Sequence, residues 1–274
     1  MDTFFDGVTS LIVLALGASI GSFLNVVVYR LPAGLSILWP PSRCPHCLHQ
    51  LGKQENVPIL GWLWLKGRCR HCRSRISARY PLVEAATGIL YLLVFWIFGL
   101  SGETLAYWVF VSWLMALSLI DLDTMTLPNV LTQSGLVLGL LFQAIAGFLP
   151  NSSGIELITH LMSGLIGMVV GIWLFDMITW LGSAVFGQSV MGGGDAKLAA
   201  MMGAWLGWQY LLLAGFIACA IGAFGGVTVI ALGRMSRRQQ IPFGPFLALG
   251  AGIALFWGQP ILSAYLKLFF PLNS

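Results

Sequence analysis

Charged residues are scarce in this sequence of 274 residues, of which only 9% are Asp, Glu, Lys or Arg, while 58% are hydrophobic. Soluble domains carry about 25% charged residues, and an apolar core of any size still needs a polar surface around it. The composition therefore excludes an ordinary soluble globular protein. The mean hydropathy of +0.86 instead predicts an integral membrane protein.

Two familiar catalytic motifs and one targeting signal are missing as well. The chain has no Gly-x-x-x-x-Gly-Lys-Ser/Thr loop for phosphate and no His-Glu-x-x-His pair for a catalytic metal. Its first residues, MDTFFDG, lack the basic segment of a cleaved secretory signal. We therefore expect the first apolar run to stay in the mature protein, and any chemistry to lie at the border between membrane and cytoplasm.

Apolar runs of the length needed to cross a bilayer, about 20 residues, recur along the chain. They lie at 8–28, 82–99, 104–120, 130–149, 158–181, 209–232 and 243–264, with a shorter, glycine-spaced run at 196–207. The predicted fold class is all-α: a polytopic membrane protein of about eight transmembrane helices with a small cytoplasmic loop domain in which four cysteines bind zinc. We divide the chain into a first transmembrane helix at 1–29, a basic loop at 30–80 and a seven-helix membrane core at 81–274.

Positive charge is concentrated in two stretches. Of the 14 Lys and Arg residues, nine lie between residues 30 and 80, and three lie at 234–238. Because loops rich in Lys and Arg stay in the cytoplasm, eight spans place both stretches inside and the N-terminus outside. A basic loop on that side favours contact with anionic membrane lipids, and we expect no nucleic-acid partner.

Four of the five cysteines form two pairs in the basic loop. CPHC at 44–47 and CRHC at 69–72 are separated by 21 residues, a spacing slightly longer than that of common zinc ribbons. Thiols stay reduced in the cytoplasm, so a tetrahedral zinc site is favoured over disulfides. The predicted ligands are Cys44, Cys47, Cys69 and Cys72, whereas His46 and His71 are expected to be bystanders; a redox or metal-free role for the cysteines is the alternative.

Three carboxylates stand where apolar segments meet the predicted cytoplasmic face. Asp121 and Asp123 end one span in SLIDLDTMTLPN, and Asp195 begins another in MGGGDAKL. Two carboxylates from different helices can meet in a wet crevice, share a proton and activate water for attack on a peptide carbonyl. Asp176 lies inside an apolar run, so we expect it to face the bundle, most simply in a structural hydrogen bond, or a wet cavity.

The three glycines before Asp195 admit two interpretations. Gly192, Gly193 and Gly194 can take positive φ and allow another chain to approach closely, which favours a strip that binds an extended substrate backbone. Alternatively, the stretch is a turn in which Asp195 only caps the following helix.

Five stretches follow one another along nearly the whole chain: GSFLNVVVYRLP at 21–32, the paired CxxC motifs, SARYPLVE at 77–84, IDLDTMTLPN at 120–129 and GGGDAKL at 192–198. Together and in this order they resemble type IV prepilin peptidases, which are inner-membrane aspartic proteases of the GxGD class. The resemblance implies a bundle of about eight helices in the bacterial inner membrane, with the N-terminus in the periplasm. It also implies an enzyme that cuts the leader from prepilins or pseudopilins after a glycine.

The resemblance further implies particular residues and a second activity. The catalytic aspartates map to Asp121, which lies seven residues before Pro128, and to Asp195; Asp123 then becomes a neighbour or helper. Many members methylate the new N-terminal residue with S-adenosylmethionine, and the resemblance points to the cysteine loop for that activity without indicating cofactor-binding residues. One departure is the separation of Asp121 and Asp195 by 74 residues, longer than expected for the family; we attribute the extra length to the loop near 147–157.

Two alternatives remain open from the sequence. A transporter could move a cation or proton through Asp121, Asp176 and Asp195, because membrane helices broken by glycine occur in transporters. A peptidase that does not methylate its product is the other.

Overall fold

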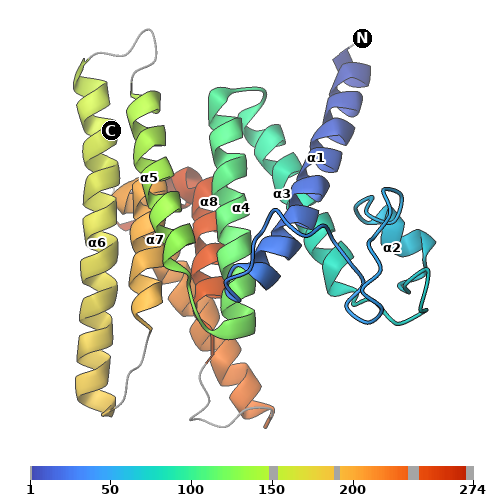
Figure 1. Ribbon diagram of the computed structural model, residues 1–274. Coiled ribbons are helices and arrows are strands. Elements are labelled where there is room, and N and C mark those ends of the chain that lie inside the picture. Colours follow the sequence, from blue (N-terminus) through green and yellow to red (C-terminus); the bar gives the residue numbers. More distant parts are fainter. Residues whose placement is uncertain (1, 148–153, 188–191, 234–240, 270–274) are drawn as a thin grey trace. The chain divides into compact units, whose positions relative to one another are not determined.

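Helices are the main secondary structure of the described part of the chain, and a long loop that contains only the short α2 separates α1 from α3 (Figure 1). The computed structural model describes residues 2–147, 154–187, 192–233 and 241–269. Its helices are α1 (Asp2–Arg30), α2 (Leu60–Trp64), α3 (Arg79–Phe98), α4 (Gly102–Thr124), α5 (Asn129–Ala146), α6 (Gly154–Phe186), α7 (Gly193–Ala231) and α8 (Gly244–Phe269). No β-strand occurs in these described ranges. The all-α prediction is confirmed.

Seven helices in the described part of the chain, all except α2, are long and apolar enough to cross a membrane. The predicted number was about eight, and the difference lies in α7. Gly207 interrupts this helix with φ 78° and ψ 170°, a conformation that glycine adopts without a steric penalty. The predicted spans at 196–207 and 209–232 are thus the two parts of α7. The protein is a multi-pass membrane protein.

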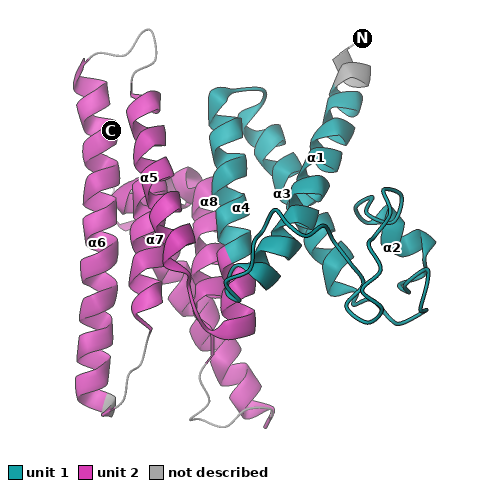
Figure 2. Ribbon diagram, viewed as in Figure 1, with its two compact units in different colours: residues 1–116 teal, residues 117–274 magenta. Residues whose placement is uncertain are grey.

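The chain divides into two compact units, residues 1–116 and 117–274, with the division inside α4 (Figure 2). In the first unit, glycines let α1 and α3 pack closely, since a Cβ at Gly17 or Gly21 would lie 2.8 Å from the Cα of Gly88 or Glu84. Glu84 also anchors the loop that precedes α3, because its Oε2 accepts a hydrogen bond of 2.7 Å from the backbone N–H of Ile59.

The second unit is also held together where backbones approach closely. A Cβ added at Gly203 of α7 would collide with the backbone of Gly167 on α6, and one at Gly171 would lie 2.7 Å from the backbone of Ala199. Small residues at such positions allow van der Waals packing and are typical of membrane helix pairs. Trp205 ties α7 to α5 through a hydrogen bond of 2.7 Å from its Nε1 to the carbonyl of Gly135. The start of α7, which carries Asp195, is therefore firmly positioned.

Candidate active site and metal centre

Asp121 lies in the last turn of α4 and is buried, with 5% of its surface exposed. Its Oδ2 accepts a hydrogen bond of 2.9 Å from the backbone N–H of Gly244. Gly244 begins α8, so this N–H has no acceptor within its own helix and is free to bind a carboxylate. A charged-group hydrogen bond of this kind fixes the orientation of the Asp121 side chain.

Asp195 lies in the first turn of α7 and is also buried, with 8% of its surface exposed. Its charge interacts with that of Asp121, so the two carboxylates are near one another although they come from different helices. The N-cap of α7 is Gly192, and no side chain caps the helix. Asp195 therefore lies three residues after the N-cap, in the first turn of α7, and is not itself the N-cap residue.

The glycines before Asp195 differ from the expectation in their backbone conformation. Gly192 is extended with φ −80°, Gly193 and Gly194 are already helical, and none of the three has a positive φ. The prediction that these glycines take a positive φ is wrong, because α7 begins earlier in the chain than expected. Close approach does occur at Gly194, where an added Cβ would lie 3.0 Å from the Cβ of Leu127. At Gly193 an added Cβ would meet no described atom within 4 Å, so this position is open.

Two neighbours of the aspartates have different environments. Asp123 is exposed, in contrast to Asp121. The Nζ of Lys197 donates a hydrogen bond of 2.7 Å to Oδ1 of Asn129. This bond joins the GGGDAKL stretch to the end of IDLDTMTLPN, so Lys197 links the two segments that carry Asp121 and Asp195.

Asp176 does not face the interior of its unit. It lies on an exposed side of α6, next to Trp173 and Trp180, which are also exposed. The predicted hydrogen bond within the bundle is wrong. The physical reason is helix length: the 33 residues of α6 extend over about 50 Å, well beyond the roughly 30 Å hydrocarbon layer, so Asp176 need not sit at the bilayer centre.

The stretch GASIG at residues 17–21 fits the Gly-x-Ser-x-Gly pattern of serine hydrolases, in which the serine sits on a sharp turn between a strand and a helix. Here the stretch lies within α1, and Ser19 Oγ donates a hydrogen bond of 2.8 Å to the carbonyl of Ala15. Its glycines serve the packing of α1 on α3. The pattern is not a nucleophile site.

The four cysteines of the loop come together as a possible metal centre. One sulfur atom from each of Cys44, Cys47, Cys69 and Cys72 lies within 4.8 Å of the others. The Sγ atoms of Cys44 and Cys72 are 3.7 Å apart, and those of Cys47 and Cys69 are 3.9 Å apart. Tetrahedral zinc with bonds of about 2.3 Å separates its sulfur ligands by about 3.8 Å. The donor set and its spacing therefore fit a four-coordinate metal ion.

The two CxxC motifs have the same local geometry. In the first, Leu48 has φ 58° and its N–H donates to the carbonyl of Cys44; in the second, Arg73 has φ 59° and its N–H donates to the carbonyl of Cys69. Hydrogen bonds, the strongest from the backbone N–H of Cys47, lower the pKa of the Cys44 thiol to about 6, whereas burial and the neighbouring thiols raise the pKa of the Cys47 thiol to about 11. The thiolate form that binds metals is therefore favoured at Cys44. His46 and His71 are not members of the cluster.

Gly244 is the residue of the site that the sequence did not identify. It lies 123 residues after Asp121, in the stretch PFGPF at 242–246. A Cβ there would lie 2.7 Å from Oδ2 of Asp121, so any other residue would displace the Asp121 carboxylate. A glycine directly before a proline at the start of an apolar run is the signal in the sequence, because it marks a helix start with a free N–H.

Comparisons with known proteins agree over most of the chain. Residues 15–98 match the Bacterial Peptidase A24 N-terminal domain, and residues 108–227 match the Type IV leader peptidase family. Proteins named prepilin leader peptidase/N-methyltransferase from Stutzerimonas stutzeri and Pseudomonas aeruginosa are each 39% identical to this chain, over 93% of it and 92% of the relative. The protein of the same name from Aeromonas hydrophila is 39% identical over 91% of both. No solved structure gives a significant match. With matches of this identity and extent, the chain belongs to the type IV leader peptidase family.

Proposed function

We propose that this protein is a membrane aspartic peptidase that removes the leader from prepilins or pseudopilins and methylates the new N-terminal residue. The observation that carries the proposal is the pair of buried carboxylates, Asp121 and Asp195, which different helices bring close enough to interact. Family membership supports the same function, because the relatives are named for both activities.

The proposed peptidase step uses the two aspartates as base and acid. Two carboxylates that share a site carry one proton between them. The ionised member takes a proton from water, whose oxygen then bonds to the scissile carbonyl carbon. The other member donates its proton to the leaving nitrogen as the C–N bond breaks. Since the backbone N–H of Gly244 already binds Oδ2 of Asp121, we assign Oδ1 of Asp121 to the water.

The substrate is proposed to lie against Gly192, Gly193 and Gly194. Cleavage requires an extended peptide segment beside the carboxylates. Side chains at the three glycine positions would hinder the approach of that segment. The open space over Gly193 and the exposure of Gly192 support this role. Gly194 also permits a close contact with Leu127, since a Cβ at Gly194 would lie 3.0 Å from the Cβ of Leu127.

The proposed methyl transfer follows cleavage. The free amine of the new N-terminus attacks the methyl carbon of S-adenosylmethionine, the C–S bond breaks with its electron pair left on sulfur, and the amine gives a proton to solvent. An α-amine has a pKa of about 8, so a useful fraction is deprotonated near neutral pH without a dedicated base.

We infer that zinc occupies the cysteine site and has a structural role. A site with four thiolates is closed and has no open position for water or substrate. Metal binding also releases folding energy that a loop of this size needs. The basic loop is rich in Arg and Lys, so we place it in the bacterial cytoplasm, with the N-terminus in the periplasm and the aspartates at the cytoplasmic face of the inner membrane.

The first test measures both products by mass spectrometry. Purified protein in detergent is given a synthetic prepilin peptide and S-adenosylmethionine, and Asp121→Asn and Asp195→Asn are compared with Asp123→Asn. We expect cleavage to fall at least about 100-fold in the first two variants, because each removes a proton-transfer group. The Asp123→Asn protein should cleave at close to the unchanged rate.

The outcomes separate the parts of the proposal. Cleavage retained in Asp121→Asn or Asp195→Asn removes that residue from the mechanism. Cleavage without added methyl mass in the unaltered protein leaves a peptidase alone. The transporter alternative gains nothing from the relatives, which are named as enzymes.

A further inference from the structure

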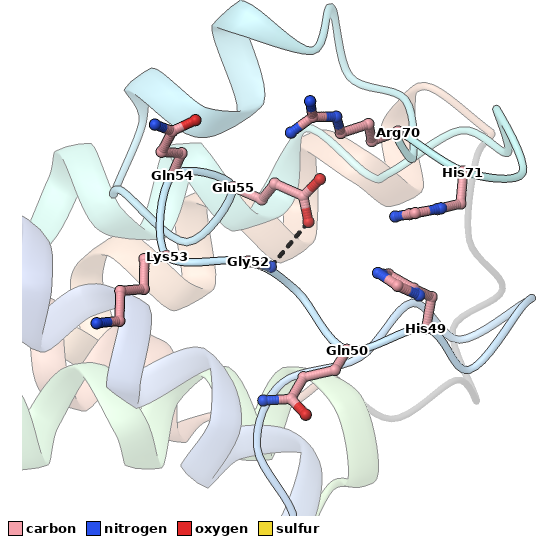
Figure 3. A pocket seen from close by; sticks show the side chains of 8 residues that line it. All are labelled: His49, Gln50, Gly52, Lys53, Gln54, Glu55, Arg70 and His71. Atoms are coloured by element: carbon pink, nitrogen blue, oxygen red, sulfur yellow. Dashed lines mark hydrogen bonds between the residues drawn. The ribbon is translucent and has the colours of Figure 1, made fainter.

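A surface cavity of about 580 Å³, open to solvent and lined mostly by exposed residues, lies beside the two CxxC motifs (Figure 3). Its wall includes His49, Gln50, Lys53, Glu55, Arg70 and His71. Pockets for small molecules usually measure about 300–1,000 Å³, so its size suits a cofactor. The cavity belongs to the first unit, whereas Asp121 and Asp195 belong to the second. The peptidase step proposed above assigns no role to these residues.

The histidines form an aromatic surface. The ring centroids of His49 and His71 are 3.5 Å apart, with an angle of 40° between the rings. Figure 3 shows both rings pointing into the space that the Glu55 carboxylate faces from the opposite side. A flat heterocycle such as adenine stacks well on a surface of this kind, as bases do on aromatic side chains.

The charged groups of the cavity have both signs. Glu55 is held in place, since its Oε2 accepts a hydrogen bond of 2.9 Å from the backbone N–H of Gly52. Arg70 extends over the same space from the second CxxC motif. A guanidinium binds carboxylates with two parallel hydrogen bonds, and a fixed carboxylate attracts a cation placed next to it.

We propose that this cavity is the binding site for S-adenosylmethionine. Arg70 binds the carboxylate of its amino-acid part, Glu55 faces the sulfonium and the ammonium, and His49 with His71 stacks on the adenine. The proposal rests on the methyltransferase half of the proposed function.

Ligands with several negative charges fit the cavity less well. A nucleoside triphosphate carries several negative charges and would meet the Glu55 carboxylate, which opposes it. S-adenosylmethionine instead combines one carboxylate, two cationic groups and a purine. The mixed charges and the aromatic pair match these groups one by one.

The cavity also explains why a methyltransferase would keep a structural metal site. His49 to Glu55 follow the first CxxC motif, and Arg70 and His71 lie within the second. A backbone bridge between Arg43 and Gln50 ties the cavity wall to the first motif. An ion that joins the four cysteines holds the two walls of the cavity together.

The test measures binding directly. Full-length protein in detergent is dialysed against radiolabelled S-adenosylmethionine and, separately, S-adenosylhomocysteine, for the unaltered chain, Arg70→Gln and Glu55→Gln. Glu55→Gln keeps an acceptor for the Gly52 N–H but loses the negative charge. We expect Arg70→Gln to raise the Kd of both compounds at least tenfold. Glu55→Gln should weaken the binding of S-adenosylmethionine, which carries a sulfonium, several times more than the binding of S-adenosylhomocysteine, a neutral thioether at the same position.

Arg73→Gln is the matched control, because Arg73 is exposed, adjoins the same CxxC motif and carries the same charge without lining this cavity. The Kd of this control for both compounds should stay within about twofold of that of the unaltered protein. Leader cleavage should be unchanged in all three variants, and this shows that they are folded. Unchanged affinity in both cavity variants, with binding in the unaltered protein, overturns the proposed site and leaves the methyltransferase intact. Cleavage by the unaltered protein with no binding and no methylation overturns the methyltransferase, and this site with it.

Discussion

Asp121 and Asp123 are two positions apart on the same helix but have different surroundings. Asp121 is buried and bonded to a backbone N–H, whereas Asp123 is exposed. A carboxylate accepts the loss of its hydration only where fixed dipoles replace water. The N-terminus of α8 supplies such a dipole at Asp121, which makes Gly244 a positioning residue for the proposed reaction.

Substituting Gly244 tests this arrangement. In Gly244→Ala the new methyl group would lie 2.7 Å from Oδ2 of Asp121, so the carboxylate must move. A displacement of about 1 Å in a catalytic group costs roughly 100-fold in rate. We expect a fall of that order in the kcat of leader cleavage, with little change in KM. Methylation of a peptide that has already been cleaved should continue at the unaltered rate.

Gly252→Ala is the matched control. It lies in the same helix, and a Cβ there would meet no described atom within 4 Å. Alanine also has a higher helix propensity than glycine, so this variant should cleave normally. Normal cleavage by Gly244→Ala would show that the bond to Asp121 does not position the carboxylate for the reaction.

At the scale of the elements, α7 is the central helix of the second unit. Its first part carries Asp195 and packs against α5 and α6 through Trp205 and Gly203. Its second part packs against α8, where a Cβ at Gly250 would collide with the carbonyl of Ala214. The break at Gly207 allows one helix to serve both contacts in different directions.

The contact between α6 and α7 predicts a stability effect. In Gly203→Ala the added methyl group meets the backbone of Gly167, which cannot rotate away as a side chain can. Such overpacking costs about 1–3 kcal/mol. Thermal unfolding in detergent should therefore show a lower midpoint for this variant.

A second glycine on the same helix provides the comparison. In Gly225→Ala the nearest atom to the new Cβ would be the Cε1 of Phe246 at 3.9 Å, an ordinary contact. This variant should unfold at the original midpoint or slightly above it. Equal midpoints for the two variants would mean that α6 and α7 can separate without cost.

At the scale of the whole molecule, the two proposed activities fall in different compact units. The aspartates and Gly244 belong to residues 117–274, while the cysteines and the cavity beside them belong to residues 1–116. An enzyme arranged in this way can lose one activity and keep the other.

Removing the metal should show this separation. Dialysis against a chelator is expected to strip one ion per chain, and binding of S-adenosylhomocysteine and methylation should fall together because the cavity walls are released. Cleavage should be much less affected. Metal content, binding and cleavage are measured on the same sample, before and after zinc is restored.

Cys219→Ser and Cys44→Ser provide the comparison for metal removal. Cys219 lies outside the cluster, so its variant should retain the full metal content. Cys44→Ser should lose most of it, since a thiolate ligand is removed. Full binding of S-adenosylhomocysteine by a metal-free chain would contradict the structural role of the ion.

Features that depend on local chemistry could be predicted from the sequence. Runs of apolar residues must cross the bilayer, and paired cysteines in a reducing compartment indicate a metal, so the helical membrane fold and the cluster of Cys44, Cys47, Cys69 and Cys72 could be predicted. The family resemblance of the motifs around Asp121 and Asp195 indicated these residues rather than Asp123, and this assignment stays a prediction.

The tertiary structure decided what depends on contacts between distant segments. Gly244 meets Asp121 across 123 residues, and His49 meets His71 only because the two CxxC motifs fold together. Periodicity and spacing carry no information about such distances. The exposure of Asp176 depends on the length of α6, and the helical conformation of Gly193 and Gly194 depends on the residue at which α7 begins. The surroundings of these residues depend on how the helices pack against one another, and no single stretch of sequence shows that packing.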